Sequence, residues 1–216
     1  AEEMRELVRR LGEFLAYTLS KPNVEYITAS QVTDWEIHDS QAIRAEDVRE
    51  MAKELGNGPD YFIRDKRSLC PVEILTLFAN YLQGKHISPA FLYGPEREAA
   101  SISAGELKVG DLARAVSEQY HTVLGYRQLP DLYETGESRI NPVDMFCTLR
   151  TAIQRNLSAE DRIEPSIGEG KLICGRHVDS SNDWGGNWII FPESLDVSNM
   201  IRVARLQTWT LKPALY

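Results

Sequence analysis

The stretch Pro71-Val72-Glu73-Ile74-Leu75 recurs as Pro142-Val143-Asp144-Met145-Phe146, and this internal repeat decides the predicted fold. The dipeptide Pro59-Asp60 recurs as Pro130-Asp131 with the same spacing along the chain. Proline at the first position of a helix costs no hydrogen bond, and an acidic residue in the first turn interacts favourably with the helix dipole. Each copy of the stretch therefore predicts the start of an apolar helix.

A second pair of matching segments lies upstream, where residues 43–48 align with residues 107–112 at a shorter spacing. The loop that follows is thus seven residues longer in the second copy. Self-similarity of this kind indicates stacked structural repeats. The sequence predicts two helical hairpins, over residues 43–84 and 107–156, each with a Pro-containing loop between its two helices.

The segments that flank the repeats have different patterns. Apolar residues at three- and four-residue steps predict a helix over residues 2–19, and alternation predicts a short strand near residues 24–28. Glycines punctuate the chain after residue 164, where we expect a strand at 188–191 and a last helix over 197–206.

These patterns together predict a mainly α fold that is α+β only at its two ends. The first part, residues 1–36, is expected to be a helix, a strand and a short helix. Residues 37–160 hold the two helical repeats. Residues 161–216 form a Gly-rich segment with a strand and the final helix.

Composition excludes several classes of protein. The 216 residues are 43% hydrophobic and 26% charged, which is ordinary for a folded chain. The formal net charge of -8 disfavours nucleic acid as a partner, and charges interrupt every apolar run before it could span a membrane. The chain opens at Ala1 with a charged amphipathic segment and no secretory signal, so we expect a mature or truncated protein.

Two resemblances to known families follow from these segments. Residues 4–35 resemble the last helix and strand of the polysaccharide deacetylases. The resemblance is carried by residues 11–17 and 21–35, with the run Val24-Glu25-Tyr26-Ile27-Thr28-Ala29-Ser30 and the closing Trp35. Residues 128–132 and 138–146 are similar to pseudomurein-binding repeats, which share a Leu-Pro, a short turn and an acidic-aromatic helix start. The first copy departs from that pattern at Gly58, which precedes Pro59 in place of leucine.

The resemblances imply the tail of a deacetylase barrel that continues into repeats which bind a cell-wall polymer. They also imply an extracellular or cell-envelope location. Deacetylases of this class bind a divalent metal through an aspartate and two histidines spaced H-x-x-x-H, and that motif does not occur in this sequence. We therefore expect no catalytic residue, metal or cofactor in this chain.

The residues themselves support the same expectation. The four histidines are scattered, so we interpret them as surface residues. The three cysteines form no C-x-x-C pair, so we interpret them as small buried hydrophobes. Glu73 and Asp144 are explained by the helix dipole. The cluster of His177, Asp179 and Asp183 is interpreted as a solvated loop, with a small hydrolase centred on residues 174–183 as the alternative.

Aromatic residues are the best candidates for ligand binding, because flat rings stack on the C–H faces of sugars. The candidates are Trp184, Tyr133, Tyr61 and Trp188, whereas Trp209 is expected to pack in the core. The leading hypothesis is a non-catalytic accessory region that binds a carbohydrate or cell-wall polysaccharide and is associated with a polysaccharide deacetylase. A helical protein-interaction module is the alternative, ahead of the small hydrolase.

Overall fold

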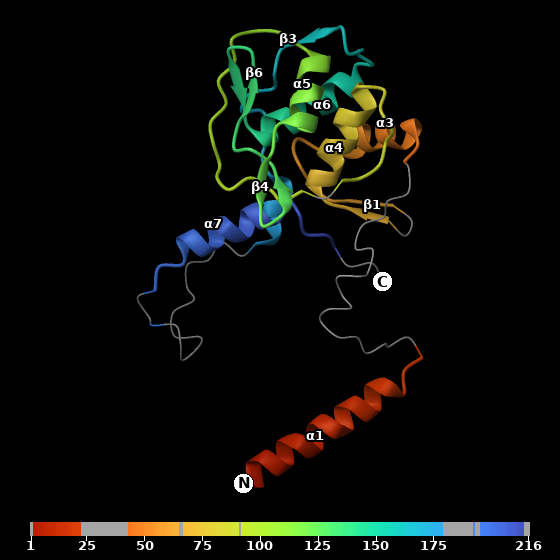
Figure 1. The fold of residues 1–216 in the computed structure, drawn as a ribbon, viewed down its shortest axis with the longest axis vertical. Helices are drawn as coiled ribbons and strands as arrows, with labels where there is room; N and C mark the ends of the chain where they lie inside the picture. The colour runs from red at the N-terminus through yellow and green to blue at the C-terminus, as the bar shows by residue number, and fades with distance from the viewer. Residues whose placement is uncertain are drawn as a thin grey trace. The chain divides into compact units, whose positions relative to one another are not determined.

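The computed structural model describes residues 2–22, 43–64, 67–90, 92–178, 192 and 195–213. By its contacts the chain divides into two compact units, Ala1–Ile37 and His38–Tyr216. Both repeats and the segment that follows them belong to the second unit (Figure 1).

Helix α1 (Glu2–Leu19) is the main described part of the first unit, and it confirms the helix predicted from apolar periodicity. None of its residues is buried, and its polar face is joined by ion pairs such as Arg10 with Glu6, at 2.8 Å. Apolar side chains therefore lie exposed along one stripe of this helix. The strand expected near residues 24–28 lies outside the described residues.

The second unit is built from two copies of one motif, each a helix, a β-hairpin and a second helix. The first copy comprises α3 (Ala45–Glu54), β1 (Phe62–Arg64), β2 (Arg67–Leu69) and α4 (Pro71–Leu82). The second comprises α5 (Val109–Glu118), β4 (His121–Val123), β5 (Tyr126–Gln128), β6 (Tyr133–Thr135), β7 (Ser138–Ile140) and α6 (Pro142–Gln154). The remaining elements are β3 (Leu107–Lys108), β8 (Arg162–Ile163), the 3-10 helix η1 (Ile173–His177) and α7 (Ser198–Gln207).

The prediction of a mainly α fold is wrong, because the fold is mixed α/β. The loop expected between the helices of each repeat is an antiparallel β-hairpin, with Phe62 opposite Leu69 in the first copy and Tyr133 opposite Ile140 in the second. A strand of three residues contains too little alternation for a period of two to be recognised in the sequence. The repeat is thus a helix–β-hairpin–helix motif and not a helical hairpin.

The predicted starts of the two apolar helices are confirmed. In α4 the carboxylate of Glu73 accepts a hydrogen bond from the backbone N–H of Cys70, at 3.0 Å. In α6 the side chain of Asn141 accepts one from the backbone N–H of Asp144, at 2.9 Å. Each helix thus begins at a proline after an extended capping residue, and side-chain bonds at that point satisfy backbone N–H groups around the first turn.

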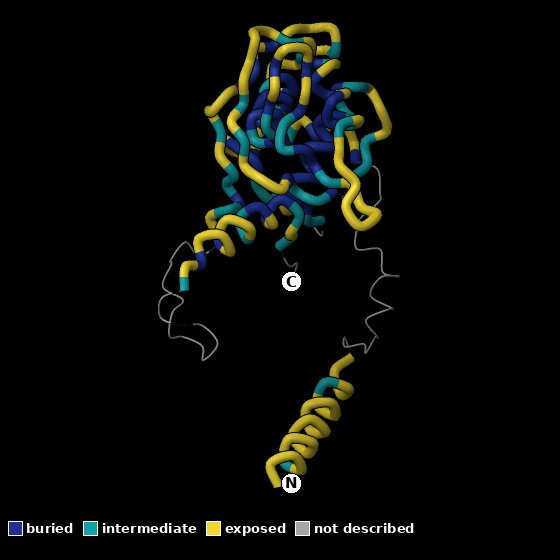
Figure 2. The backbone as a smooth tube through the Cα atoms, turned by 60° about the vertical axis from the view of Figure 1, so that its left-hand side comes forward, coloured by how far each residue is buried: buried dark blue, intermediate teal, exposed yellow. Residues whose placement is uncertain are grey.

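The two repeats are held together by exchange of helix partners. Helix α4 packs mainly against α5, and α3 packs mainly against α6, so each repeat completes the other. The amide of Gln83, after α4, donates to the Ala113 carbonyl at 2.9 Å, and the amide of Gln154, in α6, donates to the Ala52 carbonyl at 2.7 Å. Neither repeat could bury its apolar helix alone, and Figure 2 shows the resulting buried centre.

The core is continuous across both repeats. Phe78 of α4 and Phe146 of α6 meet within it, with ring centroids 5.3 Å apart. Trp209, after α7, is also buried, as expected from the sequence. No helix among the described residues is long and apolar enough to cross a membrane.

Candidate functional site

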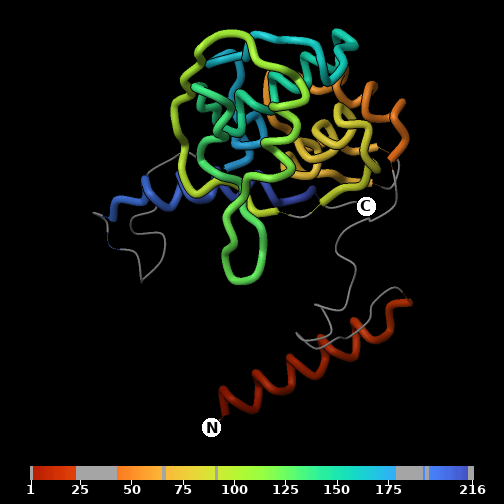
Figure 3. Tube along the Cα trace, turned by 45° about the horizontal axis from the view of Figure 1, so that its top comes forward, coloured from red at the N-terminus to blue at the C-terminus, as the bar shows by residue number. Residues whose placement is uncertain are grey.

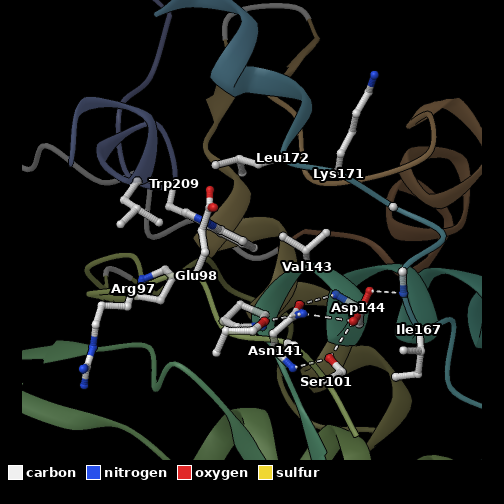
Figure 4. Close-up of a pocket in the computed structure, with 17 residues that line it drawn as sticks. Arg97, Glu98, Ser101, Asn141, Val143, Asp144, Ile167, Lys171, Leu172 and Trp209 are labelled. Atoms are coloured by element: carbon white, nitrogen blue, oxygen red, sulfur yellow. Dashed lines mark hydrogen bonds between the residues drawn. The ribbon is translucent and has the colours of Figure 1, made fainter. Parts of the chain in front are cut away.

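A cavity of about 410 Å³ lies at the start of α6 (Figure 4). One wall is the N-terminal end of α6, a second is the extended segment 95–101, and a third is the segment 167–172. Leu206 and Trp209 contribute from the end of α7 and the turn after it. Four segments far apart in sequence therefore meet at this point.

The polar wall of the cavity is organised by hydrogen bonds to the carboxylate of Asp144. Its side chain is buried, and its Oδ2 accepts hydrogen bonds from Ser101 Oγ at 2.5 Å and from Asn141 Nδ2 at 2.9 Å. Its Oδ1 accepts from the backbone N–H of Gly168, at 2.9 Å. Ser101 Oγ in turn accepts from the backbone N–H of Asn141, at 2.9 Å. The carboxylate thus ties three walls of the cavity together.

The matching acid in the first repeat has a different environment. Glu73 is fully buried and pairs with Lys212 near the end of the described chain, with a distance of 2.7 Å between Nζ and Oε1. The backbone N–H of Val72 donates to the Trp209 carbonyl at 3.1 Å, which brings the same C-terminal segment over the start of α4. The chain therefore covers the first acid, whereas the second borders a cavity.

The wall opposite Asp144 is mainly apolar. Figure 4 shows Trp209 and Leu172 on that side, with Glu98 beside them. The segment that carries Leu172 is fixed to the first repeat, because the backbone N–H of Ile173 donates to the Pro59 carbonyl at 2.9 Å. A side chain at Gly170 would overlap Cys147 Sγ, so this wall packs closely on α6.

Charged residues surround the opening. Glu98 and Lys171 are both exposed, and no hydrogen bond or ion pair joins either side chain to another described residue. They also line a second cavity, of about 510 Å³, together with Arg176 and Arg205. The two cavities adjoin, because both are lined by Glu98, Lys171 and Leu172. Because they share these residues, we describe the two cavities together and call them the α6 cleft.

The described residues among those proposed from sequence for ligand binding do not line the α6 cleft. Tyr133 is fully buried in β6, so neither face of its ring is open to a ligand. Tyr61 is half-buried and stacks on His177, with ring centroids 5.8 Å apart and an angle of 26°. Burial raises the pKa of Tyr61 to about 12. Trp184 and Trp188 lie outside the described residues.

The cysteines and three of the four histidines agree with the interpretation made from sequence, whereas His38 lies outside the described residues. Cys70, Cys147 and Cys174 are free and buried, and burial raises the pKa of the Cys174 thiol to about 11. In the loop of the hydrolase alternative, residues 179–183 lie outside the described residues. His86, His121 and His177 are exposed, and no cluster of three metal-ligating side chains occurs among the described residues.

Comparison of the chain with known proteins found no match. No family model matches the chain, no curated protein matches it, and no solved structure matches it.

Sequence reasoning missed most residues of the α6 cleft. Asn141 could have been found, since an asparagine directly before a helix-starting proline is a typical N-cap. Ser101, Glu98 and Lys171 had no local signal, because segments distant in sequence bring them to the cleft.

Proposed function

We propose that the second unit is a non-catalytic region that binds a cell-wall polysaccharide or another glycan, and that it is associated with a polysaccharide deacetylase. The observation that carries this proposal is the α6 cleft. Ligand sites are concave, largely apolar and furnished with a few fixed polar groups, commonly with volumes of about 300–1,000 Å³. The first cavity, of about 410 Å³, has these properties.

The shape and chemistry of the cleft favour a chain-like ligand. Two adjoining cavities, of about 410 and 510 Å³, offer successive subsites and not one closed pocket. Glu98 and Lys171 stand at their junction, where they can accept from and donate to hydroxyl and amide groups of a sugar. Lys171 and Arg205 further suit a glycan that carries carboxylate groups, whereas Arg176 already pairs with Asp60, at 2.8 Å.

Helix α1 supports the association with another domain. Met4, Leu11 and Phe14 lie on its apolar stripe and are 64%, 55% and 60% exposed. An apolar surface of this kind marks a contact with another protein surface. Residues 4–35 resemble the last helix and strand of a deacetylase barrel. In the proposed arrangement α1 is therefore that last helix, and its apolar stripe packs on the rest of the barrel. The same observation favours a protein-interaction module as the second candidate function.

Retention of the purified chain on insoluble peptidoglycan, pseudomurein and chitin tests the proposal. We expect retention on at least one polymer and, for the double variant Glu98→Ala/Lys171→Ala, an affinity at least about tenfold lower, because hydrogen bonds to charged groups contribute about 1.5–3 kcal/mol each. The matched control is Glu137→Ala/Lys53→Ala, whose residues are exposed and line neither cavity.

The outcomes separate the candidate functions. No retention of the wild-type chain on any of the polymers would refute the proposal and place the protein-interaction module first. Retention that is equal in the wild type and in the cleft variant would leave polysaccharide binding in place and exclude the α6 cleft as the site.

A further inference from the structure

The matching acids at the starts of α4 and α6 hold different parts of the chain. Asp144 accepts hydrogen bonds from Ser101 Oγ at 2.5 Å and from the Gly168 N–H at 2.9 Å, and so fixes the polar wall of the α6 cleft. Glu73 has the equivalent position in the first repeat, and it pairs with Lys212, with 2.7 Å between Nζ and Oε1. The segment that Glu73 fixes is therefore the last part of the described chain.

The ion pair between Glu73 and Lys212 is largely shielded from water. The side chain of Glu73 is fully buried, and that of Lys212 is 22% exposed. Oε2 of the same carboxylate accepts from the backbone N–H of Cys70, at 3.0 Å, so the acid is fixed to the start of α4 and cannot follow Lys212 away from it. A buried charge that loses its partner is costly. The pair therefore resists displacement of the C-terminal segment.

Two further bonds hold the same segment. The backbone N–H of Val72 donates to the Trp209 carbonyl at 3.1 Å. The thiol of Cys174 donates to Thr208 Oγ1 at 3.2 Å, which joins the segment to η1. Figure 3 shows this dark-blue part of the chain, after α7, running along one edge of the second unit. Residues 208–212 are thus held between the start of α4 and η1.

This part of the chain carries the apolar wall of the α6 cleft. Trp209 and Leu206 line the first cavity, and Arg205 lines the second. Trp209 also packs closely on the strand-like segment opposite, because a side chain at Gly94 would come within 2.6 Å of Trp209 Cβ. The residues that follow, 95–101, form another wall of the first cavity. A displacement of Trp209 would therefore alter two walls of the cleft.

We propose that Glu73 and Lys212 are positioning residues of the α6 cleft, and that their ion pair is a latch that holds the apolar wall at Trp209 opposite the polar wall at Asp144. This inference rests on the proposed function and assigns a role in binding to two residues that line neither cavity. The duplicated acid then has two roles. In the second repeat it fixes the polar wall directly, and in the first repeat it fixes the apolar wall through Lys212.

Acrylamide quenching of Trp209 fluorescence tests the latch without a ligand. Phenylalanine first replaces the other three tryptophans, Trp35, Trp184 and Trp188, so that the buried Trp209 is the sole fluorophore. In this background Lys212→Met is expected to increase the quenching and to shift the emission to longer wavelength, because water and acrylamide reach a ring that has lost its fixed position. Lys212→Arg is expected to retain the wild-type values, since a guanidinium also pairs with a carboxylate.

Lys108→Met is the matched control. It removes the ammonium group of another ion pair, Lys108 with Glu160 at 3.0 Å, whose side chains are 45% and 85% exposed. Neither residue lines a cavity of the α6 cleft. This variant should therefore change neither the quenching of Trp209 nor the retention of the chain on a polymer.

A double variant separates the latch from folding. Lys212→Met alone leaves a buried carboxylate without its ammonium partner and is expected to lower the urea midpoint. Glu73→Gln/Lys212→Met removes both charges, keeps an oxygen for the Cys70 N–H and is expected to unfold near the wild-type midpoint. If the pair acted on stability alone, the double variant would quench and bind like the wild type. The latch predicts instead increased quenching and an affinity for the retaining polymer at least about fivefold lower, as is typical of coupled sites.

The failures of the two proposals are distinguishable. Wild-type quenching and wild-type retention in Lys212→Met and in the double variant would overturn the latch and leave the cleft. Increased quenching with unchanged retention, while Glu98→Ala/Lys171→Ala loses retention, would overturn the role of the pair in binding. No retention of the wild-type chain on any polymer would overturn the proposed function, and with it the role of the latch in binding, whatever the quenching of Trp209 shows.

Discussion

Replacement of Asp144 by alanine is the most informative test of the architecture. The carboxylate is buried and accepts hydrogen bonds from Ser101 Oγ, Asn141 Nδ2 and the Gly168 N–H, at 2.5, 2.9 and 2.9 Å. Asp144→Ala removes all three and leaves the donors without their acceptor. Asp144 also lies in the first turn of α6, so part of its effect comes from the helix dipole.

The expected cost can be worked out by comparison with Asp111. That residue is also in a first turn, of α5, but its side chain is 49% exposed and pairs with Arg114. Asp111→Ala should lower the free energy of unfolding by about 1 kcal/mol, from the helix dipole and one exposed ion pair. Asp144→Ala should lower it by about 3–5 kcal/mol, because buried donors to a charged acceptor lose their partner.

Urea denaturation followed by circular dichroism at 222 nm measures both variants. With a slope of about 2 kcal/mol per molar urea, the midpoint should fall by about 2 M for Asp144→Ala and by about 0.5 M for Asp111→Ala. Equal decreases in the two variants would refute the reasoning, since Asp144 would then act through the helix dipole alone.

Three further predictions concern buried groups and tight turns. No described residue accepts a hydrogen bond from the buried Tyr133 hydroxyl, so Tyr133→Phe should leave the free energy of unfolding unchanged or raise it by up to about 1 kcal/mol. Tyr133→Ala should lower it by about 3–5 kcal/mol. A loss above about 1 kcal/mol in the phenylalanine variant would reveal a hydrogen bond to that hydroxyl. Burial raises the pKa of the three thiols to about 11 or 12, so none should react with iodoacetamide at pH 8 before unfolding. These pKa values of the folded chain lie above those of the unfolded chain, so the free energy of unfolding should stay constant below about pH 8.5 and fall as the pH rises towards 11, by up to about 1.4 kcal/mol per thiol per pH unit. A free energy of unfolding that does not change over that range would contradict the raised pKa values. A side chain at Gly58 would overlap the Lys171 carbonyl, so Gly58→Ala should lower the free energy of unfolding by about 3 kcal/mol. Gly136→Ala should lower it by about 1 kcal/mol, because φ is +63° there and nothing lies within 4 Å of the added carbon. Equal melting temperatures of the two variants would contradict this difference.

Local signals accounted for the helices. The apolar periodicity of residues 2–19 and the prolines at 71 and 142 predicted α1, α4 and α6 at or near their observed bounds. The unequal spacings within the repeat placed seven extra residues after α5, and the structure shows the β4–β5 hairpin there. These features depend on residues within a few positions of one another, and such information is contained in the sequence.

Local signals failed for the hairpins and for the burial of aromatic residues. The strands β1, β2, β6 and β7 are short, and their pairing is decided by the helices that they join. The sequence predicts Tyr133 as an open residue of a loop, but alternation within β6 directs its side chain inward. Conversely, Tyr126 carries no sequence signal, because nothing near it shows that its hairpin stays outside the core.

The sequence by itself determined that the chain is a duplicated unit with defined helix starts, because helix capping and apolar periodicity are properties of neighbouring residues. Only the tertiary structure decided that the helices exchange partners between repeats, that Lys212 covers Glu73 and that Asp144 borders a cleft. Those contacts join segments that lie far apart in the chain, as Ser101 with Asp144 and Glu73 with Lys212 illustrate. Their formation depends on how two packed repeats share one core, which no local pattern specifies.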